Sequence, residues 1–172
     1  MSQLSNVNIR QVAISDASAL VVFFKKLHAE SAYLLYGTDE WHADQCAVER
    51  YLTRLLAVGK STIFIAVNNH NEIAGFICGI VPQNARLSHV MQINIGVLRT
   101  YRRLGFGKQL AEKLCAYAQT VGIERAEAAI IRENKHSLHL CQQFGFAIEG
   151  VKRNAIKIND ERYDEVMLSV LL

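Results

Sequence analysis

Residues 97–114, VLRTYRRLGFGKQLAEKL, contain the most informative pattern in this chain. This stretch begins at the end of an alternating, strand-like run and contains Gly105 and Gly107. An amphipathic helix follows these glycines. Glycine lets a ligand approach the backbone, and the first turn of a helix offers free N–H groups and about +0.5 of dipole charge. The basic residues around these glycines are Arg99, Arg102, Arg103 and Lys108. The stretch therefore predicts an anion site, and a pyrophosphate is its natural ligand.

The residues of this loop exclude two common phosphate-binding motifs. The dinucleotide fingerprint needs a third glycine, and Leu110 stands where that glycine would be. A Walker loop needs a glycine five residues before Gly107 and a Ser or Thr after the lysine, but the chain has Arg102 and Gln109 there. What remains between strand and helix is Arg-x-x-Gly-x-Gly.

The pattern on both sides of this loop alternates between strands and helices. Upstream it predicts a strand at 7–13, a helix capped by Ser15-Asp16, a helix at 44–58, a hairpin of strands at 62–67 and 73–81, and a strand at 90–97. Downstream it predicts a helix ending at Gly122, a strand at 126–131, a helix at about 135–144 and a hairpin turning at Asn159-Asp160. We expect one α/β domain over residues 1–172, with its core at about 7–172 and a mixed sheet.

Composition excludes several classes of protein. The chain has 172 residues with 19 Lys+Arg against 16 Asp+Glu, and the surplus of +3 is too small to predict a nucleic-acid or membrane partner. No apolar run approaches the ~20 residues of a membrane span, and the first residues lack the pattern of a signal peptide, so we expect a cytoplasmic protein. The four cysteines are scattered, and His136 and His139 lack a third ligand, so we expect no metal site.

Two blocks of the chain resemble the GCN5-related N-acetyltransferases (GNAT). The loop from Arg102 to Gly107 is similar to the family's Gln/Arg-x-x-Gly-x-Gly/Ala, and Asn134, Ser137 and Leu140, followed by Gly145-Phe146, are similar to its second block. The tail GFAIEGVKRNAIKINDERYDEVML, residues 145–168, looks like the end of a bacterial branch. The resemblance implies a mixed, mostly antiparallel twisted sheet of six to seven strands with about four helices.

The resemblance also implies a cosubstrate, acetyl-CoA, and transfer of its acetyl group to a primary amine of a small molecule, peptide or protein. The backbone of Ile95, Gly96 and Val97 would pair with the pantetheine where the next strand splays away. The loop residues expected at the phosphates are Arg102, Arg103, Leu104, Gly105, Phe106, Gly107 and Lys108. Asn134 can cap the next helix, contact the cofactor, or do both.

The catalytic residues depart from the family pattern. Cys141 stands where the family has the Tyr that protonates the departing thiolate, and it is a candidate general acid or an inert packing residue. Gln92 stands near the family's acidic strand residue; Gln cannot take a proton but can orient an amine or a water. Tyr33 and Tyr36 are candidates for acceptor binding, with ordinary packing, together with Trp41, as the alternative. Asp164 is a weaker candidate base and a better anchor for the hairpin.

An intact phosphate loop beside a missing acid leaves a second hypothesis open. The chain can be a CoA-binding sensor or regulatory module in which catalysis is impaired. A nucleic-acid-binding domain would spread basic and aromatic residues along a face, whereas Arg99, Arg102, Arg103 and Lys108 cluster at one loop. The last strand and its hairpin are candidate surfaces for a homodimer.

Overall fold

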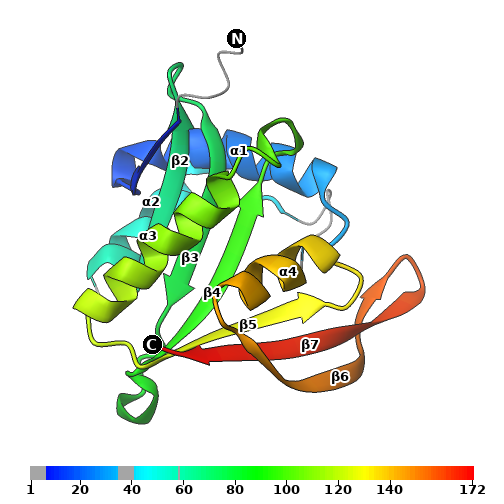
Figure 1. The fold of residues 1–172 in the computed structure, drawn as a ribbon. Helices are drawn as coiled ribbons and strands as arrows, with labels where there is room; N and C mark the ends of the chain where they lie inside the picture. The colour runs from blue at the N-terminus through cyan, green and yellow to red at the C-terminus, as the bar shows by residue number, and fades with distance from the viewer. Residues whose placement is uncertain (1–6, 35–40, 58) are drawn as a thin grey trace.

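A computed structural model describes residues 7–34, 41–57 and 59–172. Within these residues the chain forms one seven-stranded sheet in the order β1-β2-β3-β4-β5-β7-β6 (Figure 1). The strands are β1 (Val7–Gln11), β2 (Thr62–Asn68), β3 (Ile73–Ile80), β4 (Val90–Val97), β5 (Arg125–Ile131), β6 (Ala147–Ile158) and β7 (Glu161–Leu171). The α-helices are α1 (Ala17–Glu30), α2 (Gln45–Ala57), α3 (Phe106–Thr120) and α4 (Lys135–Gln143).

Only one pair of neighbouring strands in this sheet is parallel. β4 and β5 run in the same direction, and α3 makes the crossover between them, as a parallel pair requires. The other neighbours are antiparallel. The predicted mixed, mostly antiparallel sheet with four flanking helices is confirmed.

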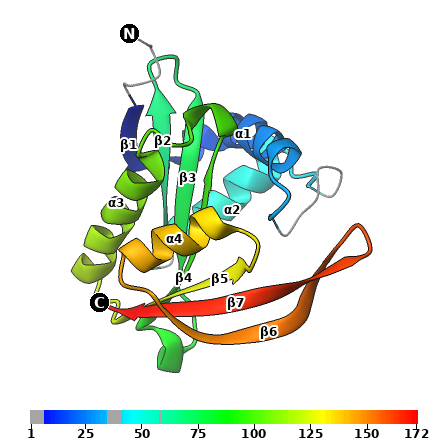
Figure 2. The same ribbon diagram turned by 45° about the vertical axis from the view of Figure 1, so that its right-hand side comes forward.

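Helices cover the two faces of the sheet unequally. α1 and α2 pack on one face of the β1–β4 half, where Leu20, Phe23 and Leu27 lie among the apolar side chains of β2 and β3. α3 covers the other face through Leu110 and Leu114. α4 lies on the same side of the sheet as α3, over the β5–β7 half (Figure 2). β4 is covered on one face by α1 and on the other by α3.

Polar residues near the ends of the helices and strands explain several of their boundaries. Asp44 caps α2 because its Oδ1 accepts the Ala47 N–H at 2.7 Å. The final hairpin turns at Asn159 and Asp160, whose φ angles of 47° and 67° are those of a two-residue type I′ turn. α1 begins directly after Asp16, within the cap predicted at Ser15-Asp16, but the Asp16 carboxylate accepts no N–H of α1. It pairs with Arg10 at 2.7 Å and accepts the Ala13 N–H, so β1 ends at Gln11 and a short 3₁₀ turn precedes the helix.

Candidate functional site

The parallel strands β4 and β5 separate soon after they meet. Val90, Met91 and Gln92 pair with Arg125, Ala126 and Glu127, and the pairing stops there. Both strands continue, β4 to Val97 and β5 to Ile131, and Figures 1 and 2 show them diverging beneath α4. The predicted splay is therefore present. In the described ranges, the edge of β4 beyond Gln92 has no partner strand on the β5 side.

Hydrogen-bond alternation identifies the backbone groups on this open edge. The Leu98 N–H donates to the Ala74 carbonyl of the β3 side at 2.9 Å, so the even-numbered residues of β4 bond toward β3. Ile93, Ile95 and Val97 then direct their N–H and C=O groups toward β5. The backbone groups of Ile95 and the N–H of Val97 offer a ligand the edge that a further strand would use, whereas the Val97 carbonyl oxygen accepts from Arg102 Nε.

Arg102 reaches back to this edge. Its Nε donates to the Val97 carbonyl oxygen at 2.9 Å. The bond closes the loop between β4 and α3 and positions the guanidinium at the end of the open edge. The predicted phosphate residue Arg102 is thus also a structural tie within the loop.

The N-terminus of α3 carries backbone donors without acceptors. Gly105 precedes the helix with a φ of +83°, a left-handed conformation that glycine adopts at little cost. Counting from the start of α3, Gln109 is the first residue whose N–H donates to a backbone carbonyl oxygen, that of Gly105, at 3.1 Å. In the part of the chain that the structure describes, the N–H groups of Phe106, Gly107 and Lys108 have no acceptor. This helix end can bind an anion.

The two glycines nearest the site are needed for different reasons. A Cβ on Gly96 would lie 2.7 Å from Leu27 Cδ2 and 2.9 Å from Phe76, so a side chain there would displace Leu27 and Phe76 where α1 packs on β4. A Cβ on Gly107 would meet nothing closer than Leu140 at 3.7 Å, which is an ordinary contact. The fold alone does not require Gly107 to be a glycine, and this supports a close ligand approach at that position.

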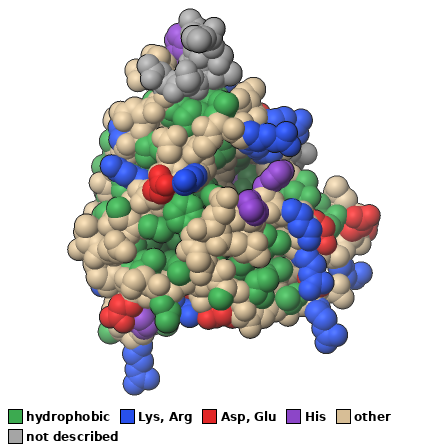
Figure 3. All heavy atoms as spheres, viewed as in Figure 1, with side chains coloured by type: hydrophobic (Ala, Val, Ile, Leu, Met, Phe, Trp, Pro, Cys, Tyr) green, Lys and Arg blue, Asp and Glu red, His purple; other side chains and the backbone are tan. Residues whose placement is uncertain are grey.

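The basic residues of the loop are exposed, and Figure 3 shows Lys and Arg side chains gathered near the start of α3. Arg99 is linked to α1, since its backbone N–H donates to Glu30 Oε2 at 2.6 Å. Lys108 lies 3.8 Å from Glu112. Arg103 has no side-chain partner among the described residues, and its own φ is +61°. The exposed Leu104 lies among them. The loop therefore holds free positive charge beside the bare helix end.

The second block of motif residues lies on α4. Asn134 caps this helix, because its side-chain oxygen accepts the Ser137 N–H at 3.3 Å. Cys141 packs with Leu138 and Phe144 against the cluster beneath α4. Burial raises the pKa of the Cys141 thiol to about 11. The thiol stays protonated at neutral pH, and it is a weaker acid than an exposed thiol.

Gln92 lies exposed at the point where β4 and β5 separate. Because Gly96 faces α1, Gln92 shares that face, four residues earlier in the strand. Its partner in the register is Glu127, a carboxylate that the sequence did not single out. Arg125 Nε lies 2.7 Å from Glu127 and also pairs with Glu149. Nothing local in the sequence could identify Glu127, since the pairing depends on the register between strands more than thirty residues apart.

The acceptor candidates are only partly described. Tyr33 is exposed and lines an open pocket against the β6–β7 hairpin, while Tyr36 lies outside the described residues. Trp41 stacks on His28 with ring centroids 5.6 Å apart, which favours the packing interpretation for this residue. Asp164 accepts the Asn154 N–H at 3.0 Å and pairs with Arg132, as expected of an anchor in the hairpin.

Two further observations, on membrane-spanning helices and on metal ligands, concern the described residues. None of their helices is long and apolar enough to cross a membrane. In the same ranges no three His, Cys, Asp or Glu side chains gather as a metal ion would need. His136 and His139 are exposed on α4.

Known proteins share this arrangement. Residues 25–146 match the model of the Acetyltransferase (GNAT) family. The acetyltransferase of the GNAT family from Streptococcus pneumoniae superposes with a TM-score of 0.93 at 25% identity, over 97% of this chain and 100% of that chain. YncA of Salmonella typhimurium, solved with its cofactor acetyl-CoA, gives 0.86 at 15% identity, over 98% and 95%. A GNAT superfamily phosphinothricin acetyltransferase from Sinorhizobium meliloti, in complex with acetyl-CoA, gives 0.85 at 13% identity, over 96% and 88%. A comparison with curated proteins finds no match.

The match to the family model covers more than half of the chain and includes β4, the glycine loop, α3 and α4. The likeness to solved structures extends over nearly all of it. Together with the diverging strands and the bare end of α3, these matches show that the chain belongs to the acetyltransferase (GNAT) family.

Proposed function

We propose that this protein transfers the acetyl group of acetyl-CoA directly to a primary amine of a small molecule, peptide or protein. One observation carries the proposal: the unpaired edge of β4 leads to the bare N-terminus of α3, where the Arg102 and Arg103 side chains lie exposed. An amide-containing chain that ends in a pyrophosphate fits these two features in that order. Two of the solved relatives are named with acetyl-CoA.

In this proposal the chain binds its cosubstrate mainly through the backbone. Ile95 and Val97 pair with the pantetheine amides, as one strand pairs with another. The N–H groups of Phe106, Gly107 and Lys108 donate to the pyrophosphate, and the helix dipole adds to the attraction. Arg102, Arg103 and Lys108 supply positive charge, and Asn134, which caps α4, is a further candidate contact for the cosubstrate.

The reaction needs no covalent enzyme intermediate. The amine nitrogen attacks the thioester carbonyl carbon, the C–N bond forms, the C–S bond breaks, the amine loses a proton and the thiolate gains one. Gln92 would orient the amine or a water at the separation point, without accepting the proton itself. Cys141 is the candidate donor to the thiolate. Its pKa of about 11 makes this transfer uphill by about 3 kcal/mol to a thiolate of ordinary basicity, so its contribution should be small.

The second candidate function is a CoA-binding sensor or regulatory module. The observation that favours it is the position of Cys141 in an apolar cluster, where the family has a Tyr. A thiolate can leave without enzymatic protonation because a thiol is already fairly acidic, so the replacement lowers the rate without abolishing it. We therefore keep the enzyme as the main proposal. We also propose that it acts in the cytoplasm, and the homodimer through the last hairpin stays a prediction.

Two measurements on the same preparation test the proposal. Calorimetric titration with acetyl-CoA should show binding that weakens when Arg102 and Arg103 are both changed to Ala. Thiol release from acetyl-CoA should depend on an added amine. Acetyl-CoA binding without thiol release for any amine of a broad panel favours the sensor. Absence of binding, or binding that the double change leaves untouched, overturns the cosubstrate site.

A further inference from the structure

An open pocket of about 420 Å³ lies between the segment after α1 and the β6–β7 hairpin. Tyr33 lines it from one side and Tyr163 from the other. Glu133 and Glu161 supply two carboxylates, and Asn159 supplies an amide. The remaining described lining is apolar, and no described Lys or Arg contributes to it. The pocket therefore combines two phenol rings with two negative charges.

The pairing of the hairpin keeps its own cations away from the pocket. Ile158 pairs with Glu161, and residues directly opposite in an antiparallel pair share a face. The next pair, Lys157 with Arg162, points to the other face of the hairpin. Lys157 is also engaged by Asp160 at 2.6 Å. The negative charge of the pocket is thus not neutralised from within the hairpin.

One of the pocket carboxylates is held in place. The Tyr163 hydroxyl donates to Glu161 Oε2 at 2.7 Å. This bond raises the pKa of Tyr163, with smaller effects from desolvation and from the charges of Glu161 and Glu133. Glu133 lines the same pocket as Tyr163 and Glu161. A cation between the rings and the two carboxylates would offset part of this negative charge.

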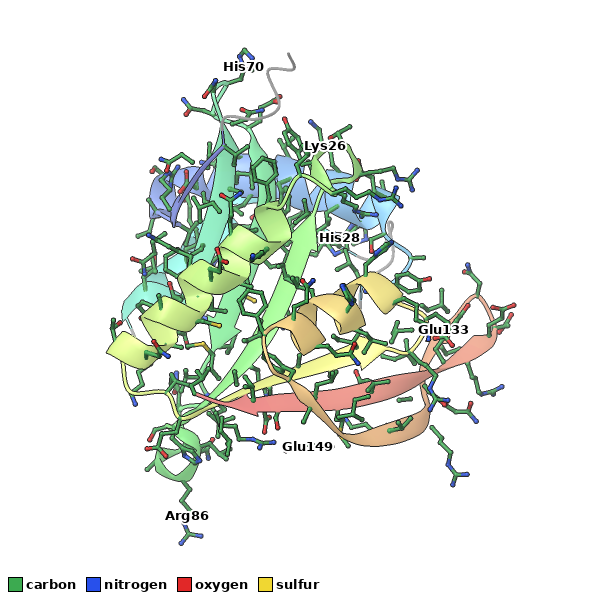
Figure 4. The ribbon with its side chains drawn as sticks, viewed as in Figure 1. Lys26, His28, His70, Arg86, Glu133 and Glu149 are labelled. Carbon is green, nitrogen blue, oxygen red and sulfur yellow. The ribbon has the colours of Figure 1, made fainter. Side chains whose placement is uncertain are left out.

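The position of the pocket relates it to the diverging strands. Tyr33 follows α1, whose last residue, Glu30, accepts the N–H of Arg99 just after β4. Glu133 comes two residues after the end of β5, and Figure 4 shows it beside the β6–β7 hairpin. The pocket thus lies beside the carboxyl end of β5, and α1 links its Tyr33 side to the residue that comes two positions after β4. A molecule held there can extend one end toward the edge of β4.

We infer that this pocket selects an acceptor that carries a second positive charge, an aliphatic diamine or polyamine, and binds its far ammonium group between Glu133, Glu161 and the two tyrosine rings. The inference rests on the proposed function, because it assigns the acceptor of that reaction. An ammonium over a phenol ring is attracted to the ring face, and an exposed ion pair adds a similar, modest attraction. The combination corresponds to a preference of about tenfold over an uncharged end.

Three acceptors of equal chain length test the inference. 1,4-Diaminobutane, butylamine and 4-aminobutanoate differ only in the far end, which is positive, apolar or negative. The ratio of kcat/KM for the diamine to that for butylamine should be about ten, and 4-aminobutanoate should be the poorest acceptor. Glu133→Gln and Glu161→Gln should each lower this ratio about threefold through the KM for the diamine. Asp160→Asn is the matched control, since it removes one charge from the same turn but does not line the pocket.

Direct binding decides the inference even if no turnover is seen. Calorimetric titration of 1,4-diaminobutane into the CoA-loaded protein should show binding that Glu133→Gln and Glu161→Gln weaken and Asp160→Asn does not. Equal affinity in all four forms, or a preference for butylamine or 4-aminobutanoate, overturns the assignment of the pocket. Failure of acetyl-CoA itself to bind overturns the proposed function instead, so the two failures are distinguishable.

Discussion

The Nε of Arg102 lies 2.9 Å from the carbonyl oxygen of Val97, the last residue of β4. The first residue of the glycine motif is therefore bonded to the strand edge that the cosubstrate is proposed to use. Arg103, its neighbour, makes no such bond in the described part of the chain. The two arginines thus differ in what their removal should do.

We expect Arg103→Ala to weaken acetyl-CoA binding about tenfold without changing stability, because it removes a charge-assisted phosphate contact and no internal bond. Arg102→Ala should weaken binding and also lower the free energy of unfolding by about 1 kcal/mol, since the bond to Val97 is lost. Calorimetry at low and high salt and denaturant unfolding measure both effects. Arg86→Ala is the control, because Arg86 projects from the opposite end of the molecule (Figure 4). An equal loss of affinity in Arg86→Ala would mean that only the overall charge matters.

Gly107→Val tests whether the space beside this glycine belongs to a ligand. A Cβ there meets only ordinary contacts, and valine is no worse than glycine in a helix, so the melting temperature should stay within about 3 °C. Acetyl-CoA affinity should fall at least about tenfold, because the side chain would occupy the approach to the helix N–H groups. Thermal unfolding and calorimetric titration give the two values. Retained affinity with retained stability would remove Gly107 from the site.

Gly96→Ala should act on packing. The new Cβ would meet Leu27 at 2.7 Å and Phe76 at 2.9 Å, so we expect a loss of about 1–3 kcal/mol in the free energy of unfolding. Leu27→Ala also destabilises the protein, since it opens a cavity. The two changes together should cost less than the sum of the separate costs, because shortening Leu27 makes room for the new Cβ. Additive costs in a double-mutant cycle would contradict the contact.

The sequence predicted the order of the elements well because local signals mark each boundary. Gly105 and Gly122 frame α3, and Asn159-Asp160 fix the last turn with φ angles that few other residues adopt. The cap of α1 was less predictable, because the Asp16 carboxylate is drawn to Arg10 on a neighbouring segment. The pocket carboxylates Glu133 and Glu161 were not predicted at all. They meet only through the register of strands, which short-range patterns do not encode.

Cys141 can be tested by comparing three forms of the protein. If its thiol donates the proton, Cys141→Ala should lower turnover, by about threefold or less given a pKa of about 11, and Cys141→Tyr should raise it. The pH dependence of kcat in each form separates proton donation from packing, because a lost packing contact does not shift a titration. Equal turnover in the three forms would remove Cys141 from the mechanism.

Cys78 predicts how stability changes at alkaline pH. Burial raises the pKa of this thiol to about 11, whereas in the unfolded chain it titrates near 8.5. Between these values the unfolded state releases a proton that the folded state keeps, so stability falls as the pH rises from about 8.5 to about 11, by about 3 kcal/mol at most. Urea unfolding at several pH values measures the slope. Cys78→Ala should make the slope shallower without removing it, because burial also raises the pKa values of Cys141 and Cys115.

The short pairing of β4 with β5 would make the stability of this protein depend on its proposed cosubstrate. Three residue pairs join the two halves of the sheet, and the rest of the β4 edge is left for a ligand. A ligand that completes a sheet adds RT ln(1 + [L]/Kd) to its stability, about 2.7 kcal/mol at a hundred times Kd. The lifetime of the folded chain would then rise and fall with the supply of acetyl-CoA. When that supply fails, the amide hydrogens of Ile95 and Val97 on the open edge of β4 should exchange faster, while those bonded to β3 stay protected.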